Sequence, residues 1–458
     1  MSMTHFLIAG AGHGGLCAAM HLARAGECVT VIERQSEATL GHDWMDCFEF
    51  GVLERNGFRG LPESGKVQPW NNTLYGPGKR WPKLPPDELV TMEACFERRE
   101  LLAHMVADCR EAGVDFLFET EVAAPLVNGN RVRGLLIRGP QRNRSFVGVG
   151  VREGGAQKEL PADMVIDAAG GLSVIRENMP EDILFPVRLK PEQLFHVWRG
   201  YLERLPGPDP QYPYKTVLGH QGRKGISWVI AYRDSMDVLV GQVDKPLTQA
   251  DIAEALDDLR AFEPLLGWKI LRGGFATIPL RRPLGMMVAN GYAAVGDSAY
   301  MADPFCGSGI CSAIDQGKLL AEVLLHHCRG DFSVEKLWSY QVRVFTEKPP
   351  ALVGFGTKDA KERAASEALT SAVLTLRPKQ VDVMFRRGII SIDNIDGPQV
   401  AMKLLARNLD HLPLLVKLAG AAAKGGKLAT IIENIPEDYN TQAVMKWVRA
   451  YEGFKAPG

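Results

Sequence analysis

The chain has 458 residues, and its 53 lysines and arginines nearly balance its 54 aspartates and glutamates, which leaves a formal net charge of −1. This balance argues against a nucleic-acid-binding surface, and the length is enough for two or three domains with a large core. Apolar runs are short or interrupted and no basic segment precedes a hydrophobic one, so we expect a cytoplasmic protein. The eight cysteines show no Cys-x-x-Cys spacing, which predicts no metal site and favours reduced thiols in the core.

In chain order, the first informative segment joins an apolar run, His5–Ala9, to the glycine-rich sequence GAGHGG at Gly10–Gly15. It predicts a strand that ends at Gly10, a tight turn, and a helix that begins near Gly12. Free N–H groups at the start of such a helix favour an anion such as a diphosphate. In this interpretation Gly10 permits the turn, Gly12 lets the diphosphate approach the backbone, and Gly15 lets the helix pack closely on its strand.

The next apolar run, Val29–Ile32, predicts a second strand that leads to Glu33. In a strand–turn–helix–strand unit, a carboxylate at this position is typical of one that binds the two hydroxyls of a ribose. We therefore predict dinucleotide binding, with a merely tight turn as the alternative. Arg34 is a candidate for a 2′-phosphate contact or, alternatively, a solvated surface arginine.

The sequence pattern of residues 96–182 predicts further helices and strands of the same domain. Phe96–Gly113 has a helical pattern, Val114–Phe118 is expected to be a strand, and Val132–Ile137 with Phe146–Val149 has the pattern of a hairpin. A buried strand, Met164–Asp167, is followed by small residues, which let a backbone approach a cofactor.

Residues 183–284 differ from the preceding part, because alternating apolar stretches are interrupted by prolines and glycines. This pattern predicts an antiparallel sheet that covers a pocket with one face. The substrate-contacting candidates on this sheet are His196, Trp198, Trp228 and Tyr232. Ordinary half-buried sheet positions are the alternative interpretation of His196 and Tyr232.

Residues 285–330 return to the first domain and carry a second glycine-rich segment followed by a helical pattern, which we expect to complete the site begun at the N-terminus. Residues 331–458 look helical. The apolar stretch Leu412–Lys424, interrupted by lysines, predicts packing on the sheet domain or, alternatively, peripheral contact with a membrane surface. The predicted domains are therefore 1–182 with 285–330, then 183–284, then a helical region, 331–458.

Four features together resemble the flavoprotein superfamily of aromatic hydroxylases, flavin halogenases and geranylgeranyl reductases: Gly10 to Glu33, Arg98, the strand ending at Asp167, and Gly296–Ile310. The resemblance extends over residues 1–330. It implies an α/β fold with a Rossmann-type FAD-binding domain, an antiparallel-sheet substrate domain and a helical C-terminal region. It also implies FAD as the bound dinucleotide.

The same resemblance implies the roles of individual residues. Asp297 would contact the ribityl and phosphate region, and Pro304–Ile310 would lie beside the isoalloxazine. Arg98 would reach an FAD phosphate or ribose, with a surface salt bridge to a neighbouring glutamate as the alternative and Arg99 as the second choice. The cofactor-binding candidates are Gly10, Gly12, Gly14, Gly15, Glu33, Arg34, Arg98, Gly296, Asp297, Pro304, Gly307, Ser308, Gly309 and Ile310.

Within the superfamily, the spacing of glycines in Gly296–Ile310 is similar to that of geranylgeranyl reductases. This implies reduction of a carbon–carbon double bond in an apolar, isoprenoid substrate by hydride transfer from reduced flavin N5. The candidates for the accompanying proton donor are Cys47, Tyr300 and His42, in that order. A buried structural thiol and a redox pair with Cys306 are the alternatives for Cys47.

Two other functions stay open. A flavin-dependent monooxygenase would hydroxylate an aromatic or polyketide-like substrate, with His196 or Tyr232 as the base, although Ala169 stands where the hydroxylase motif has aspartate. An electron-transfer flavoprotein without a small substrate is the third option, but the cysteine cluster of an iron–sulfur site is missing. Because no second Gly-x-Gly-x-x-Gly is present, we expect transiently bound NAD(P)H or a redox protein as the electron donor.

Overall fold

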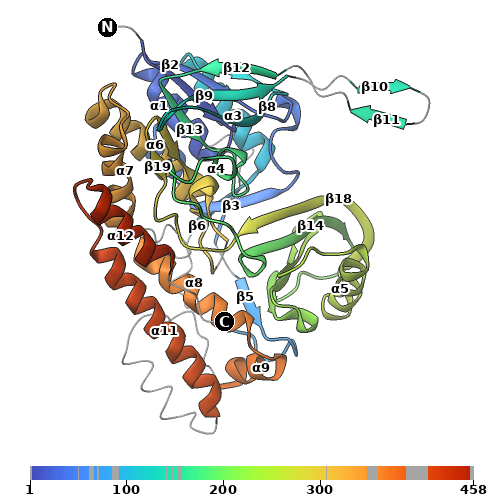
Figure 1. Cartoon of the computed structure of the whole chain (residues 1–458). Coiled ribbons are helices and arrows are strands. Elements are labelled where there is room, and N and C mark those ends of the chain that lie inside the picture. The colour runs from blue at the N-terminus through green and yellow to red at the C-terminus, as the bar shows by residue number, and fades with distance from the viewer. Residues whose placement is uncertain are drawn as a thin grey trace.

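The computed structural model of the chain (Figure 1) describes most of its length. The described residues are 3–49, 51–60, 66–69, 72–84, 92–139, 143–146, 149–152, 157–305, 307–347, 359–387 and 411–453.

A six-stranded sheet forms the first layer, in the order β19-β20-β13-β1-β2-β7. Its strands are β1 (His5–Ala9), β2 (Cys28–Ile32), β7 (Asp115–Leu117), β13 (Met164–Asp167), β19 (Val288–Ala289) and β20 (Tyr292–Ala294). All neighbours are parallel except β19 and β20. The central strands are continuous runs of apolar residues because both faces are covered, as is usual for parallel sheets. The sheet unites four segments that are far apart in the sequence: β1 with β2, β7, β13, and β19 with β20.

A second six-stranded sheet has the order β18-β14-β17-β16-β15-β5. Its strands are β5 (Asn72–Tyr75), β14 (Leu194–Arg204), β15 (Tyr214–Leu218), β16 (Ile226–Ala231), β17 (Ser235–Val243) and β18 (Leu266–Pro279). The pairs are antiparallel apart from β5 with β15. Helix α5 (Gln249–Phe262) covers one face of this sheet (Figure 1), where its apolar side chains pack against those of β14 and β17. The predicted antiparallel sheet is thus present, although β5 comes from the first predicted domain.

Smaller sheets surround these two. They are β3 (Met45–Glu49), β4 (Lys66–Pro69) and β6 (Met92–Glu97) in the order β3-β6-β4; β8 (Glu121–Asn128), β9 (Arg131–Arg138) and β12 (Gln157–Pro161) in the order β12-β9-β8; and the pair β10 (Asn143–Phe146) and β11 (Val149–Arg152). The predicted hairpin is wrong in its pairing, because β9 pairs with β8 and β12 whereas β10 pairs with β11.

The remaining helices are α1 (His13–Arg24), α2 (Val52–Arg55), α3 (Arg98–Glu111), α4 (Val174–Glu177), α6 (Ile310–Glu322), α7 (Val334–Thr346), α8 (Ala360–Leu374), α9 (Pro378–Arg387), α11 (Leu412–Glu433) and α12 (Thr441–Glu452). The helix predicted from Phe96 begins two residues later, because the preceding residues belong to β6. Helix α11 lies along α8 in the C-terminal region (Figure 1). A buried ion pair, Arg282 with Glu367 at 2.5 Å, ties α8 to the segment before β19.

The observed architecture confirms the predicted fold class: a Rossmann-type α/β layer, an antiparallel sheet and C-terminal helices. The predicted domain limits stay a prediction. The main core surrounds the parallel sheet, and a separate core lies between the second sheet and α5.

Candidate active site

The turn after β1 depends on glycine. Gly10 has φ +97°, and a Cβ there would lie 2.4 Å from the carbonyl oxygen of Ala168, which follows β13. A Cβ on Gly15 would lie 2.7 Å from Ala168 Cβ. The positive φ and the absent side chains therefore allow the two strand ends and α1 to meet closely. This agrees with the predicted roles of Gly10 in the turn and Gly15 in packing.

A second glycine contact brings the distant half of the site to this turn. A Cβ on Gly14 would lie 2.8 Å from the carbonyl oxygen of Ala313 in α6, and one on Gly317 would lie 2.3 Å from the carbonyl oxygen of Gly14. Helices α1 and α6 can cross this closely only without those side chains. The crossing places the segment Gly307–Ile310 beside the N-terminus of α1. We call Gly10–Gly15 with Gly307–Ile310 the glycine cradle.

A cavity of about 640 Å³ lies between the glycine cradle and the second sheet. Candidate cofactor residues that line it are Gly12, Gly14, Gly15, Arg98, Gly296, Asp297, Pro304, Gly307, Ser308, Gly309 and Ile310. The opposite side consists of Phe195, Val197 and Arg199 of β14 with Trp228 and Ile230 of β16, which we call the sheet wall. The structure thus brings the two predicted halves of the site together.

Three candidate cofactor residues do not line this cavity. Gly10 acts at the turn beneath it. Glu33 is buried, and its carboxylate accepts hydrogen bonds from the N–H groups of Ala11 at 2.9 Å and Gln35 at 2.8 Å. Arg34 is exposed, as expected for a solvated surface arginine. Contacts of Glu33 and Arg34 with a nucleotide stay predictions.

The cavity contains groups that suit a dinucleotide. His13 Nε2 is buried and has no hydrogen-bond partner within the described ranges. Burial and the nearby Arg98 lower the pKa of His13 to about 4, so the ring is neutral at pH 7. A Cβ on Gly12 would have no neighbour closer than 3.7 Å, which leaves room for a ligand at the start of α1. Asp297 opens onto the cavity, and loss of hydration raises the pKa of its carboxyl. These residues fit FAD.

Arg98 lies at the cavity in an ion pair. Its guanidinium donates to both carboxylate oxygens of Asp46, with Nη2 to Oδ1 at 2.9 Å, and it lies over the Trp44 ring. Burial alone would raise the pKa of Asp46, but the charge and hydrogen bonds of Arg98 lower it. The partner is therefore Asp46 and not a neighbouring glutamate. Arg99 lies at the surface, 3.7 Å from Asp43.

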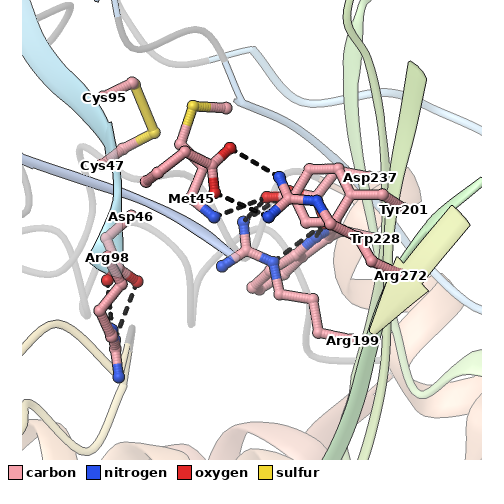
Figure 2. A network of polar contacts seen from close by, with 11 residues as sticks. Met45, Asp46, Cys47, Cys95, Arg98, Arg199, Tyr201, Trp228, Asp237 and Arg272 are labelled. Carbon is pink, nitrogen blue, oxygen red and sulfur yellow. Dashed lines mark hydrogen bonds and ion pairs between the residues drawn. A yellow bond between two sulfur atoms is a disulfide. The ribbon is translucent and has the colours of Figure 1, made fainter. Parts of the chain in front are cut away.

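A second ion pair is built into the sheet wall (Figure 2). Arg199 donates to Asp237 from Nε at 3.0 Å and from Nη2 at 2.5 Å, and the Asp237 carboxylate is fully buried. Trp228 Nε1 donates to the same carboxylate at 3.4 Å, and the Met45 N–H donates to the Tyr201 hydroxyl at 2.9 Å. The network joins the second sheet to β3 and holds Trp228 against the cavity.

The structure corrects two of the substrate candidates. His196 and Trp198 do not line the cavity, and Trp198 packs in the core under α5. Successive side chains of a strand point to opposite faces, so Phe195, Val197 and Arg199 occupy the cavity face instead. Trp228 and Tyr232 do line the cavity.

Two of the predicted proton donors, Tyr300 and His42, differ in their position relative to the cavity. Tyr300 is buried between the guanidinium groups of Arg176 and Arg281, away from the cavity lining, so its position contradicts the predicted role. His42 lines the cavity and stacks on Trp44 at 4.1 Å. Burial and the charge of Arg98 lower the pKa of His42 to about 4. A neutral imidazole is a poor proton donor at pH 7.

Cys47 lines the cavity, but it is not a free thiol. A disulfide joins it to Cys95 of β6 (Figure 2), whereas Cys306, its partner in the alternative redox pair, lies outside the described residues. The expectation of reduced thiols fails for this pair. As a disulfide, Cys47 cannot donate a proton.

Three polar residues near the cavity were not among the predicted site residues. Arg199, Asp237 and Glu93 are polar groups at or beside the cavity that the sequence analysis did not select. The alternation of β14 contained a signal, because Phe195, Val197 and Arg199 share one face. The position of Glu93 depends on the pairing of β6 with β3, which no local pattern indicates.

Comparison with known proteins agrees with this site. Residues 3–197 match the family model of an FAD binding domain. The digeranylgeranylglycerophospholipid reductase of Sulfolobus acidocaldarius is 39% identical over 94% of this chain and 93% of its own length. A geranylgeranyl bacteriochlorophyll reductase-like structure from Thermoplasma acidophilum shares the fold, with a TM-score of 0.71 over 92% of this chain and all of its own, at 18% identity. Kynurenine 3-monooxygenase of Salinispora tropica is 23% identical over 70% of this chain and 72% of its own length.

The fold, the glycine cradle and these matches define the chain as an FAD-dependent oxidoreductase. The identity over nearly the whole length then places it in a particular group: the chain belongs to the digeranylgeranylglycerophospholipid reductase family. The predictions of FAD and of the oxidoreductase class are confirmed. Among the helices of the described residues, none is both long and apolar enough to cross a membrane.

Proposed function

We propose that this protein reduces carbon–carbon double bonds of an isoprenoid chain. The observation that carries the proposal is the cavity that runs continuously from the glycine cradle to the apolar side chains of the sheet wall. Further apolar residues from the sheet and from α8 and α9 continue this lining: Ile226, Leu239, Ile278, Leu280, Val373, Leu374 and Phe385. A flexible hydrocarbon chain gains free energy by leaving water for such a surface, about 0.8 kcal/mol per buried methylene.

In this proposal the chain's residues have separate tasks. The N–H groups of the glycine cradle, His13 and Arg98 hold FAD, which supplies a hydride when it is bound and reduced. The sheet wall orients the isoprenoid chain and excludes water. A proton must reach the second carbon of the double bond, and we propose that Cys47, which lines the cavity, donates it when its disulfide is reduced.

The electron donor and the membrane contact belong to the same proposal. We infer that NAD(P)H bound transiently, or a redox protein, reduces FAD. We also propose peripheral contact with membrane lipids through α11, where Leu412 and Val416 are 50% and 61% exposed. Co-sedimentation with anionic lipid vesicles tests this contact, and Val416→Glu should weaken it.

The function is tested by reducing the purified holoprotein anaerobically and adding a polyprenyl phospholipid. Faster oxidation of the flavin, with two hydrogens gained per reduced bond in the lipid mass spectrum, supports the reductase. No saturated lipid, together with a transient blue-shifted flavin absorbance after mixing with oxygen, would favour the monooxygenase instead. The monooxygenase is supported by the relatives of that name, but of its two predicted bases, His196 faces away and burial raises the pKa of Tyr232.

A further inference from the structure

The disulfide at the cavity lies in a patch that the proposed reaction does not explain. Strands β3 and β6 are antiparallel, with Cys47 directly opposite Cys95 and Glu49 directly opposite Glu93. Because residues two apart on a strand share a face, these four side chains lie on the same face of the small sheet. Along the strands, the disulfide therefore has Glu49 and Glu93 as neighbours on one side and Met45 and Glu97 on the other.

The two sulfur atoms differ in access. Cys47 is partly exposed and lines the cavity, whereas Cys95 is only 2% exposed and is not part of the lining. Thiol–disulfide exchange requires a thiolate to attack one sulfur while the other leaves. A small thiol in the cavity can reach Cys47, so Cys95 is the leaving sulfur.

Glu93 is placed to protonate that leaving group. A carboxylate oxygen of Glu93 and the Sγ atoms of Cys47 and Cys95 all lie within 4.8 Å of one another. Glu93 lines the cavity and has no hydrogen bond or ion pair with any part of the chain that the structure describes, and burial raises its pKa to about 7. A protonated carboxylic acid therefore lies beside the disulfide in a large fraction of molecules at neutral pH.

The two other carboxylates on this face of β3 and β6, Glu49 and Glu97, are each held in an ion pair. Glu49 of β3 accepts from Arg55 Nη1 at 2.7 Å, which keeps it occupied in an ion pair. On the other side of β6, the backbone register places Gln68 of β4 opposite Glu93 and Lys66 opposite Cys95.

We propose that Cys47, Cys95 and Glu93 form a thiol–disulfide exchange site for a small dithiol that enters the cavity. The thiolate of the dithiol attacks Cys47 Sγ, the bond to Cys95 Sγ breaks, and Cys95 leaves with the electron pair and takes the proton of Glu93. The second thiol of the reductant then attacks the mixed disulfide and releases Cys47 as a thiol. Two electrons pass to the protein and the reductant becomes a disulfide. Of the two protons that the reductant loses, one goes to Cys47 and the other returns to Glu93, which gave its own proton to Cys95.

The first test follows the redox state directly. Holoprotein is incubated with dithiothreitol, alkylated without denaturant and analysed by peptide mass spectrometry. We expect Cys47, which lines the cavity, to be blocked before reduction and labelled after it. Labelling that requires urea would show a purely structural disulfide and overturn the proposal. If the pair is isolated reduced, diamide must form the 47–95 disulfide in the folded protein, and its failure to do so would equally overturn it.

Single-cysteine variants test the direction of attack. Cys95→Ser should form a mixed disulfide with glutathione disulfide at Cys47 at least about tenfold faster than Cys47→Ser does at Cys95, because only Cys47 faces the cavity. Equal rates, or faster capture at Cys95, would contradict the assigned roles. Equal FAD content in the two variants checks that both are folded.

Glu93→Gln tests the proton donor, with Glu49→Gln as the matched control on the same face. We expect Glu93→Gln to slow reduction on the order of tenfold below pH 7, and the difference from wild type to shrink above pH 7, where Glu93 has lost its proton. Glu93→Asp should recover part of the rate. Equal slowing by Glu49→Gln, or a pH-independent loss, would show that Glu93 acts only through charge or structure.

Discussion

The glycine cradle and the sheet wall border the same cavity but are built differently. The cradle is made of backbone, and its shape depends on absent side chains at Gly10, Gly14 and Gly15. The sheet wall is made of side chains, and its shape depends on which face of β14 and β16 looks inward. A site made of backbone can be predicted from a local sequence motif. A site made of side chains can be predicted only when it is known which face of each strand borders the cavity.

The buried ion pair should give the largest effect of any change in the sheet wall. Asp237→Ala leaves the Arg199 charge buried and unpaired, so we expect a loss of about 3–5 kcal/mol in the free energy of unfolding. Urea denaturation measures it. The control is Glu433→Gln, which breaks an exposed pair with Lys361 and should cost less than about 1 kcal/mol. Similar losses in the free energy of unfolding for the two variants would mean that burial does not set the cost of breaking the Arg199–Asp237 pair.

In the glycine cradle, Gly10→Ala should cost about 3 kcal/mol and most of the bound FAD, because it combines positive φ with a clash against Ala168. Gly26→Ala is the matched control. Gly26 has φ +88°, but no atom lies within 4 Å of the position that a Cβ would take there, so we expect only about 1–2 kcal/mol and full FAD content. Flavin absorbance and thermal unfolding measure both. Equal FAD loss in the two variants would contradict the close-approach argument.

The buried His13 in the glycine cradle predicts that the free energy of unfolding depends on pH. Its pKa is about 4 in the folded protein and ordinarily 6.5, so the unfolded chain binds more protons between these values. Stability should therefore fall as pH falls from 6.5 towards 4, by roughly 2–3 kcal/mol at pH 4.5 for this group.

Urea unfolding of FAD-free protein at pH 7 and pH 4.5 measures that loss. His13→Gln should reduce the difference between the two pH values, and His327→Gln, at an exposed position, should not. An unchanged difference in His13→Gln would show that other groups carry the pH dependence.

Two neighbouring residues of β14 test the assignment of faces. Val197→Phe adds volume on the cavity face and should raise KM for a long polyprenyl substrate at least about tenfold, or about 1.4 kcal/mol, with FAD content unchanged. His196→Phe, one residue earlier on the opposite face, should change KM less than twofold. Steady-state kinetics with short and long substrates measures both, and the reverse order would place the substrate elsewhere.

The smallest effect is expected at Tyr232. Its hydroxyl is buried at the cavity without a hydrogen-bond partner in the described parts of the chain, so Tyr232→Phe should leave the free energy of unfolding unchanged or raise it by up to about 1 kcal/mol. Denaturant titration measures this. A loss above that size would reveal a hydrogen bond made by the hydroxyl.

Much of the fold could be predicted because its signals are local. The strand, turn, helix and acid between His5 and Glu33 have a fixed order, and the structure follows it. The antiparallel sheet and the C-terminal helices were visible in the apolar periodicity. The orientation of β14 could not be predicted in this way. Alternation divides its residues into two sets but does not show which set packs against α5 and which lines the cavity.

The sequence by itself determined the dinucleotide turn, the glycines Gly10 and Gly15 that shape it, and the class of chemistry that FAD supplies. Only the tertiary structure decided that Cys47 meets Cys95, that Arg98 pairs with Asp46, and that Trp198 lies in a core while Trp228 faces the cavity. The physical reason is the distance along the sequence between the residues that interact. A turn or a helix start depends on neighbouring residues, whereas these partners come together only when strands distant in the sequence pair and pack.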